Sequence, residues 1–147
     1  MDKQHLTLND INIGDYVQEW LEIPGKWGTP MYIDGIFADG DVYLNLEGNE
    51  ADPFDSNVKD IYDIPIDYGI LPHFGFEEDD HNVWKIERDG WVMKVDVCKM
   101  FTGFIGRGII SKEGERSFIS KHNLNSIRKI QHFFYDKTGI ALKLNFD

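Results

Sequence analysis

A change of period at one glycine constrains this sequence more than any other feature. Before Gly139 the apolar residues recur every three or four positions, as on one face of an α-helix. After it, apolar and polar residues alternate, as in a strand with one buried face. We expect the helix to begin near Leu124, with Ser120 or Asn123 as its N-cap, and to end at the glycine. A final strand is expected over residues 140–146.

Two Asp-Gly dipeptides predict β-hairpins, because both central positions of a type I′ turn need a positive φ. Each dipeptide lies between runs of strand-like residues. The hairpins are 31–37 with 42–46, through Asp39-Gly40, and 83–88 with 91–97, through Asp89-Gly90. In the second hairpin this register places Ile86 opposite Met93 and Trp84 opposite Val95, so the apolar side chains align on one side.

The remaining segments are weaker signals. Residues 47–59 have the composition of a loop, and glycine and proline limit residues 68–76 to one or two helical turns. Residues 77–80 are an exposed acidic run. Three glycines within 101–111 predict a bulge or bend in a strand there.

These elements predict an α+β fold. Its amino-terminal part is expected to be an SH3-like small β-barrel or a curved sheet, over residues 1–66. Residues 67–147 then supply a short helical connector, a second antiparallel sheet, the long carboxy-terminal helix and the final strand, together forming one compact unit. A chain of 147 residues has the size of one ordinary domain and can bury a core without disulfides or metals.

The single cysteine, Cys98, excludes an internal disulfide and indicates a reducing compartment. At the end of a half-buried strand it is expected to be a small core side chain. The amino terminus has no apolar run of signal-peptide length, and no apolar stretch is long enough to cross a bilayer. The sequence therefore predicts a cytoplasmic protein that does not enter a membrane.

The formal net charge of −11 is unevenly spread. Residues 34–90 hold 16 acidic and 3 basic residues, whereas residues 91–147 hold 5 acidic and 10 basic residues. Direct binding of nucleic acid is disfavoured, because affinity for phosphates needs accumulated Lys and Arg. The acidic side chains form a candidate surface that either serves solubility or imitates nucleic acid as a decoy for a DNA-binding protein. Its members are Asp39, Asp41, Glu47, Glu50, Asp52, Asp55, Glu77, Glu78, Asp79 and Asp80.

No residue set in the sequence indicates catalysis. The nucleophile, phosphate-loop and Cys-x-x-Cys motifs are absent, and we predict no catalytic, metal-binding or cofactor-binding residue and no cofactor. The acids before His81 leave a small metal-dependent hydrolase as a weaker alternative, although consecutive carboxylates seldom make a dedicated site.

The predicted carboxy-terminal helix has an apolar arc wider than packing on one core requires. One interpretation places the helix between two lobes. The other assigns Phe133 or Tyr135 to an interface with a second chain, either a protein partner or a second copy in a homodimer. Arg128 and His132, on the remaining side of the helix, complete this candidate interface.

Three segments resemble a family. They are residues 12–17 (NIGDYV), Ile64-Pro65-Ile66 followed by Phe74-Gly75-Phe76-Glu77, and residues 127–139 (IRKIQHFFYDKTG). Together they resemble small uncharacterised proteins of gut Bacteroidetes and of their phages and mobile elements, in which IGN-V, IPLTEEWLLKFGF and VHQLQNLYFALTG segments recur. Here Asp67 to Leu71 and Pro72 replace the more helical central piece. The resemblance implies an accessory protein, and it carries no functional residue over.

The sequence thus favours a non-enzymatic accessory protein that acts as a protein-protein interaction module. The excess of aromatic residues and the wide apolar arc of the helix support this hypothesis. The acidic decoy is the alternative, and the metal-dependent hydrolase ranks behind it.

Overall fold

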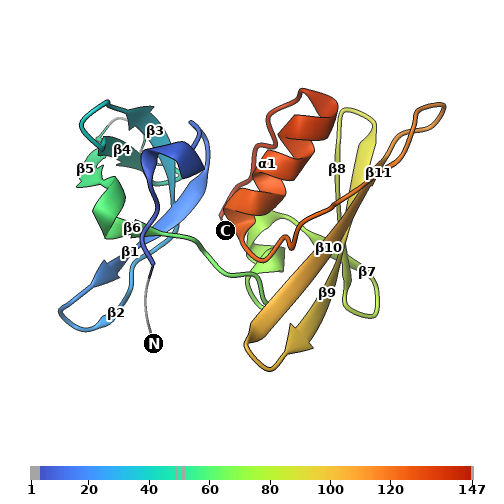
Figure 1. Cartoon of the computed structure of the whole chain (residues 1–147), viewed down its shortest axis with the longest axis horizontal. Helices are drawn as coiled ribbons and strands as arrows, with labels where there is room; N and C mark the ends of the chain where they lie inside the picture. The colour runs from blue at the N-terminus through green and yellow to red at the C-terminus, as the bar shows by residue number, and fades with distance from the viewer. Residues whose placement is uncertain (1–3, 49, 51, 147) are drawn as a thin grey trace. The chain divides into compact units, whose positions relative to one another are not determined.

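The computed structural model describes residues 4–48, 50 and 52–146. The fold is α+β, and the chain divides into two compact units, Met1–Ile64 and Pro65–Asp147 (Figure 1). We call them unit 1 and unit 2. The sequence analysis places this boundary two residues later, after Ile66.

Unit 1 is a curled, half-barrel antiparallel sheet, in agreement with the predicted curved sheet (Figure 1). The strand order is β2-β1-β3-β4-β5, with β6 also pairing with β1. Along its length β1 pairs first with β3, then with β6 and last with β2, and this change of partner curls the sheet. The strands are β1 (Tyr16–Leu21), β2 (Lys26–Trp27), β3 (Met31–Ile36), β4 (Asp41–Asn45), β5 (Phe54–Asn57) and β6 (Ile61–Tyr62). Two 3₁₀ turns, η1 (Leu8–Asp10) and η2 (Val58–Asp60), complete the unit.

Alternation along β4 shows how unit 1 separates its two faces. Val42 and Leu44 are buried in the unit 1 core, whereas Asp41 and Tyr43 are exposed on the outer face. The inward side chains of β1, β3 and β6 join the same core. Residues 54–57, which the sequence analysis assigned to a loop, form strand β5 because they pair with β4, so that prediction was wrong.

The β3–β4 hairpin is confirmed, but its turn is not type I′. The Gly40 amide donates to the Phe37 carbonyl over 3.0 Å, and the Phe37 amide donates to the Asp41 carbonyl over 2.9 Å. Gly40 has a φ of 96°, a conformation that glycine adopts without steric cost, whereas Asp39 has no positive φ. The loop between β3 and β4 is longer than the two-residue loop of a type I′ turn, so it needs one left-handed residue and not two.

Unit 2 contains a meander with strand order β11-β10-β9-β8-β7 (Figure 1). The strands are β7 (Glu77–Asp80), β8 (Val83–Arg88), β9 (Trp91–Met100), β10 (Gly103–Ser111) and β11 (Phe118–Ile119). The predicted pairs Ile86–Met93 and Trp84–Val95 are confirmed, and both residues of the Asp89-Gly90 turn have positive φ. The predicted short helical segment is a single 3₁₀ turn, η3 (Leu71–Phe74). The acidic run at 77–80 is exposed as expected, but it is an edge strand, because it pairs with β8.

The helix α1 (Ile127–Thr138) ends at Gly139 as predicted, but it begins later than expected. Its N-cap is Ser126, whose hydroxyl accepts a hydrogen bond from the Lys129 amide over 3.2 Å. Ser120 and Asn123 are therefore not the caps. Their side-chain oxygens instead accept hydrogen bonds from the amides of Gly108 and Gly106 on β10, each over 2.9 Å.

The predicted final strand is absent from the described residues, because no strand is assigned after α1. The alternation itself is present, since Leu142 and Leu144 are buried while Ala141 and Lys143 are exposed. An extended segment with one buried face therefore follows the helix, without the ladder of hydrogen bonds that defines a strand.

The glycines of β10 do not produce the expected bulge, because β10 pairs with β9 without a shift in register. They allow close packing instead. A Cβ atom on Gly106 would lie 2.5 Å from the Leu124 carbonyl oxygen, and one on Gly108 would lie 2.9 Å from the Phe133 ring. The absent side chains let α1 and the segment before it lie directly on the strand.

Candidate functional site

The net charge of the chain belongs to unit 1. Residues 1–64 hold 3 basic and 14 acidic residues, a net charge of −11, whereas residues 65–147 hold 12 of each. The sequence analysis located an acidic block in the middle of the chain, which crosses the boundary between the units. Division at residue 64 shows that one folded unit carries the whole excess of negative charge, so an electrostatic partner of this chain should be sought at unit 1.

The outer face of β3, β4 and β5 collects several of the predicted acidic residues. Residues that oppose each other in antiparallel strands project on the same face of a sheet. The register pairs Tyr43 with Gly35 on one side and with Asp55 on the other, and it pairs Asp41 with Asn57. The curled sheet thus presents an aromatic ring and carboxylates together to solvent.

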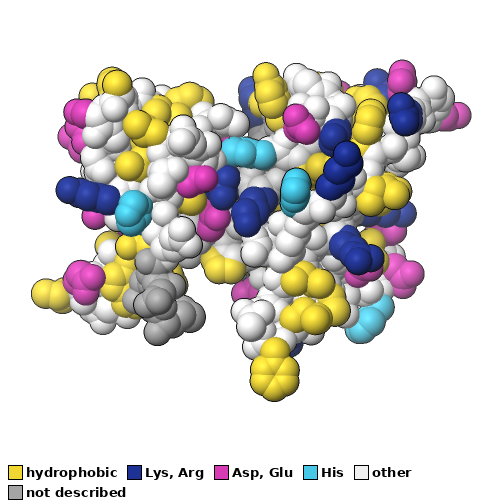
Figure 2. All heavy atoms as spheres, in the orientation of Figure 1, with side chains coloured by type: hydrophobic (Ala, Val, Ile, Leu, Met, Phe, Trp, Pro, Cys, Tyr) yellow, Lys and Arg dark blue, Asp and Glu magenta, His cyan; other side chains and the backbone are white. Residues whose placement is uncertain are grey.

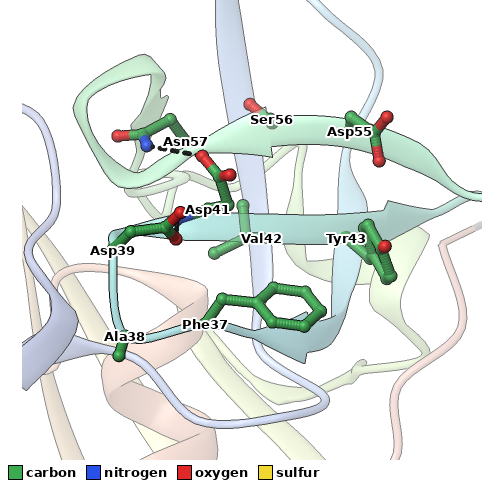
Figure 3. A pocket seen from close by; sticks show the side chains of 9 residues that line it. All are labelled: Phe37, Ala38, Asp39, Asp41, Val42, Tyr43, Asp55, Ser56 and Asn57. Atoms are coloured by element: carbon green, nitrogen blue, oxygen red, sulfur yellow. Dashed lines mark hydrogen bonds between the residues drawn. The ribbon is translucent and has the colours of Figure 1, made fainter.

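Two aromatic rings lie against each other on this face. The centroids of Phe37 and Tyr43 are 5.0 Å apart, with 69° between the ring planes, an edge-to-face arrangement (Figure 3). Gly35 lies beneath them, since a Cβ atom there would be 3.1 Å from the Tyr43 ring and 3.5 Å from the Phe37 ring. The two side chains are nevertheless 43% and 40% exposed. Unit 1 therefore displays a pair of rings that its own core does not cover.

The rings form part of a hollow of about 760 Å³, which we call the outer-sheet pocket (Figure 3). Its lining residues are Phe37, Ala38, Asp39, Asp41, Val42, Tyr43, Asp55, Ser56 and Asn57. Three of the nine are aspartates, and none is a lysine or an arginine. The volume lies within the roughly 300–1,000 Å³ that is typical of small-ligand pockets.

Hydrogen bonds hold two of the pocket aspartates in place. The Asn57 side-chain amide donates to Asp41 Oδ1 over 2.9 Å, and the Asp41 backbone amide donates to Asp39 Oδ1 over 3.0 Å (Figure 3). Among the described residues, no lysine or arginine forms an ion pair with Asp39, Asp41 or Asp55. Their charges are therefore offered to solvent and are not neutralised by any lysine or arginine of the described part of the chain.

The other predicted acids of unit 1 do not line the pocket. Glu47 accepts a hydrogen bond from the Tyr16 hydroxyl over 2.7 Å, and Glu50 accepts one from the Gly48 amide over 3.2 Å. Asp52 is exposed in the segment before β5. Burial, followed by the negative charges of the two glutamates and of Asp34, raises the pKa of Tyr32.

The acids of β7 belong to unit 2 and are partly neutralised there. Asp79 lies 2.9 Å from the Lys94 ammonium and 3.8 Å from that of Lys85. The hydrogen bond and charge of Lys94, with a smaller effect of Lys85, lower the pKa of this carboxyl. Glu77, Glu78 and Asp80 are exposed on the same edge strand. The ten predicted acidic residues therefore divide between two units and two kinds of surroundings.

The predicted interface on α1 is divided between interior and surface. Phe133 is 8% exposed and lies beside Gly108, so it fills the interior of unit 2. Arg128 is also 8% exposed, and His132 is half-buried. Tyr135, at 54%, is the member of this set that is exposed to a second chain.

A separate apolar feature lies at the tip of the β9–β10 hairpin, where hydrophobic side chains project (Figure 2). Met100 is 50% exposed, and Phe101 is exposed completely. Cys98, nearby on β9, is exposed as well, so its predicted burial was wrong. Because this residue has the parity of Asp96 and not of Val95 and Val97, the strand directs it outward. Unit 2 has no net charge, so charge indicates no partner for the tip.

Within the described residues, no group of three or more His, Cys, Asp and Glu side chains is arranged to hold a metal ion. His81 is exposed, and its amide donates to Asp80 Oδ1 over 2.7 Å. This arrangement gives the metal-dependent hydrolase hypothesis no ligand set.

None of the described helices has the length and apolar character needed to span a membrane.

Sequence reasoning missed the two rings of the pocket. It noted the hairpin and the aspartates but gave Phe37 and Tyr43 no role. The available signal was the alternation of Asp41 and Tyr43 with Val42 and Leu44, which places an aromatic residue on the polar side of a strand.

Comparison of the chain with protein-family models, curated proteins and solved structures finds no match.

Proposed function

We propose that this chain is a non-enzymatic accessory protein that binds another protein, and that the outer-sheet pocket of unit 1 is its contact surface. The observation that carries the proposal is the exposed Phe37–Tyr43 pair beside three carboxylates, none of which forms an ion pair with a described lysine or arginine. Aromatic side chains at the centre of an interface supply much of its binding energy. Charges around them raise the association rate and select the partner.

The charge of unit 1 favours a second candidate, a decoy that imitates nucleic acid and occupies a DNA-binding protein. Unit 1 has a net charge of −11, and Asp39, Asp41 and Asp55 lie on one hollow of it. The decoy and the interaction module differ in one respect. A decoy should capture a protein whose own ligand is duplex DNA, whereas an interaction module should capture a protein that does not need to bind DNA.

The association with phages or mobile elements rests on the resemblance of three sequence segments alone. It stays a prediction, because the comparisons with known proteins neither support nor oppose it. The same holds for a homodimer, for which Tyr135 is the exposed candidate residue on α1.

Affinity capture with two matched variants tests the proposal. The tagged full chain is used as bait in extracts of the cells that produce it, beside Phe37→Ser and Phe54→Ser. These two phenylalanines are both in unit 1 and have almost equal exposure, 43% and 44%, but Phe54 does not line the pocket. We expect the wild type and Phe54→Ser to retain the same partner protein and Phe37→Ser to lose it.

Two results would count against the proposal. Capture of no specific protein by the wild type would remove the interaction function. Equal capture of the partner by Phe37→Ser and by the wild type would exclude the outer-sheet pocket as the contact surface. Capture of a protein that by itself binds duplex DNA would favour the decoy.

A further inference from the structure

We propose that the outer-sheet pocket accepts an arginine side chain from a basic segment of the partner. This inference rests on the proposed function and names the chemistry of its partner. The pocket joins two features that a guanidinium group uses at once, namely the face of an aromatic ring and nearby carboxylates. Neither feature alone would indicate an occupant.

Phe37 and Tyr43 supply the aromatic wall of the pocket. A cation over an aromatic ring is attracted by the negative charge density of the ring face. The two rings are in edge-to-face contact, so they form a corner in the wall of the hollow and not a flat patch. Gly35 beneath them brings both rings down onto the backbone, which fixes the corner. The side chain that best fits such a wall is flat and cationic.

Asp39, Asp41 and Asp55 supply the carboxylates of the pocket. They line the same hollow, and none forms an ion pair with a described lysine or arginine. Asp41 is held by Asn57, so one carboxylate is oriented before any ligand arrives. A planar guanidinium offers five N–H donors, and it can stack on a ring while it bonds to carboxylates beside it. A lysine ammonium offers the charge but cannot stack, so arginine is the better fit.

The charge of the surrounding unit supports the same occupant. Unit 1 carries a net charge of −11, so a basic segment is drawn toward it over a longer range than the pocket contacts. This attraction weakens with added salt, because the Debye length is about 8 Å at physiological ionic strength. The contacts of the guanidinium inside the pocket should weaken less. The approach of the basic segment to unit 1 should therefore depend strongly on salt, and the contacts of its guanidinium in the pocket should depend on salt less.

Labelled peptides of one design measure the preference. A Gly/Ser peptide carries three arginines, three lysines or three citrullines, the last having nearly the shape of arginine without its charge. Binding to the full chain is followed by fluorescence anisotropy at low and at physiological salt. We expect the arginine peptide to bind more tightly than the lysine peptide at both salts. We expect the citrulline peptide not to saturate.

Variants then locate the binding. Tyr43→Leu should weaken binding of the arginine peptide about three- to fivefold, the usual contribution of an exposed cation–π contact, and Phe54→Leu should not change it. Asp55→Asn should weaken binding more than Glu22→Gln, which removes the same charge from the turn after β1, outside the pocket. Thermal unfolding of each variant checks that unit 1 remains folded.

The inference and the proposed function fail in different ways. Equal binding of the arginine and lysine peptides, unchanged by Tyr43→Leu, would overturn the arginine pocket and leave only diffuse attraction to unit 1. If Phe37→Ser still abolished capture of the partner, the proposed function would stand with another occupant. Loss of both the peptide preference and the partner capture would overturn the two together.

Discussion

Gly106 and Gly108 determine how closely the segment before α1 lies on β10. Both positions are buried, and both face groups that would collide with an added methyl. At Gly106 the nearest obstacle is the Leu124 carbonyl oxygen. Because this atom belongs to the backbone, it cannot rotate away as the end of a side chain could. At Gly108 the obstacles are the side chains of Leu124 and Phe133. Packing in unit 2 therefore depends on two absent side chains.

Gly108→Ala should destabilise unit 2 by about 1–3 kcal/mol, the usual cost of adding a methyl to a filled interior. The new Cβ would lie 2.6 Å from Leu124 Cδ1 and 2.9 Å from the Phe133 ring. Gly69→Ala is the control, since its Cβ would meet only Asp67 Oδ1, at 3.4 Å. Urea unfolding followed by circular dichroism measures both. Equal midpoints for Gly108→Ala and the wild type would contradict the packing described.

Two lysines lower the pKa of Asp79, and their effects are unequal. Lys94 lowers this pKa more than Lys85 does, because its ammonium is closer. Lys94→Gln should therefore raise the pKa of Asp79 toward the ordinary value of about 3.9, and Lys85→Gln should raise it less. NMR titration of the carboxyl carbon measures both shifts. A larger shift in Lys85→Gln would reverse the assignment.

The sign of the pH effect follows from the lowered pKa. A carboxyl whose folded pKa lies below its unfolded pKa stabilises the fold above the unfolded value, and this contribution disappears as pH falls through the folded value. The contribution of Asp79 is thus present at neutral pH and declines as the pH falls below the unfolded value of about 4 toward the lower folded value. Because the group is exposed, its effect on stability should be small.

Some residue roles could be predicted from the sequence, and others depended on packing. The positive φ of Asp89 and Gly90 follows from a local turn and was predicted. The close contact at Gly108 depends on Phe133, which is distant in the sequence, so a glycine-rich strand could equally be interpreted as bulged. The exposure of Tyr43 was available from the alternation along β4, but its contact with Gly35 was not, because the two residues meet only in the register that the hairpin adopts.

Helix α1 shows what the sequence determines about an element and what it leaves open. Its apolar recurrence and its terminal glycine predicted its existence and its end. Its start was misplaced, because four residues before it have short polar side chains that suit an N-cap, namely Ser120, Asn123, Asn125 and Ser126. Tertiary contacts decide among them: β10 has free amides that engage Ser120 and Asn123, which leaves Ser126 for the helix.

Ser126→Ala should therefore destabilise unit 2 by about 1 kcal/mol, the typical cost of removing a helix N-cap. Ser117→Ala is the matched control, because Ser117 is exposed outside any strand or helix. The free energy of unfolding in urea measures the difference. A cap at Ser120 or Asn123 would instead leave Ser126→Ala as stable as the wild type.

The final segment shows the reverse limit. Alternation over residues 140–146 predicted one buried face correctly, yet it does not determine whether a neighbouring strand is available for pairing. A strand is defined by its hydrogen bonds to a second segment, and the sequence of one segment does not show which segment lies beside it. The 77–80 run was missed as a strand for this reason, since four acidic residues give no apolar alternation.

For the whole molecule, the division into units changes the meaning of the charge. A net charge of −11 over one chain is a property of solubility, whereas the same charge on residues 1–64 alone is a property of one binding unit. The fold class and the curled first sheet could be predicted from local patterns. The charge of each unit could be predicted as well, because the predicted boundary after Ile66 differs from the observed one by two uncharged residues, although charge was counted over other ranges of the sequence.

The exposure of α1 bears on the predicted interface of this helix. Stable interfaces bury about 800 Å² on each partner, and Phe133 lies in the interior of unit 2, so Tyr135 alone offers too little area. We therefore expect Tyr135→Ser to leave the molar mass of the chain unchanged, as measured by light scattering at low and at high salt. A lower molar mass for Tyr135→Ser than for the wild type would contradict this expectation and would identify the helix as a dimer interface.

The most direct test of the account is the amide NMR spectrum of the full chain during titration with the three-arginine peptide. If the outer-sheet pocket accepts arginine, the largest shifts should fall on residues 37–43 and 55–57, and they should persist at physiological salt. Small shifts spread evenly over the acidic residues of unit 1, which disappear with added salt, would contradict it. That result would mean that the peptide is held by net charge alone.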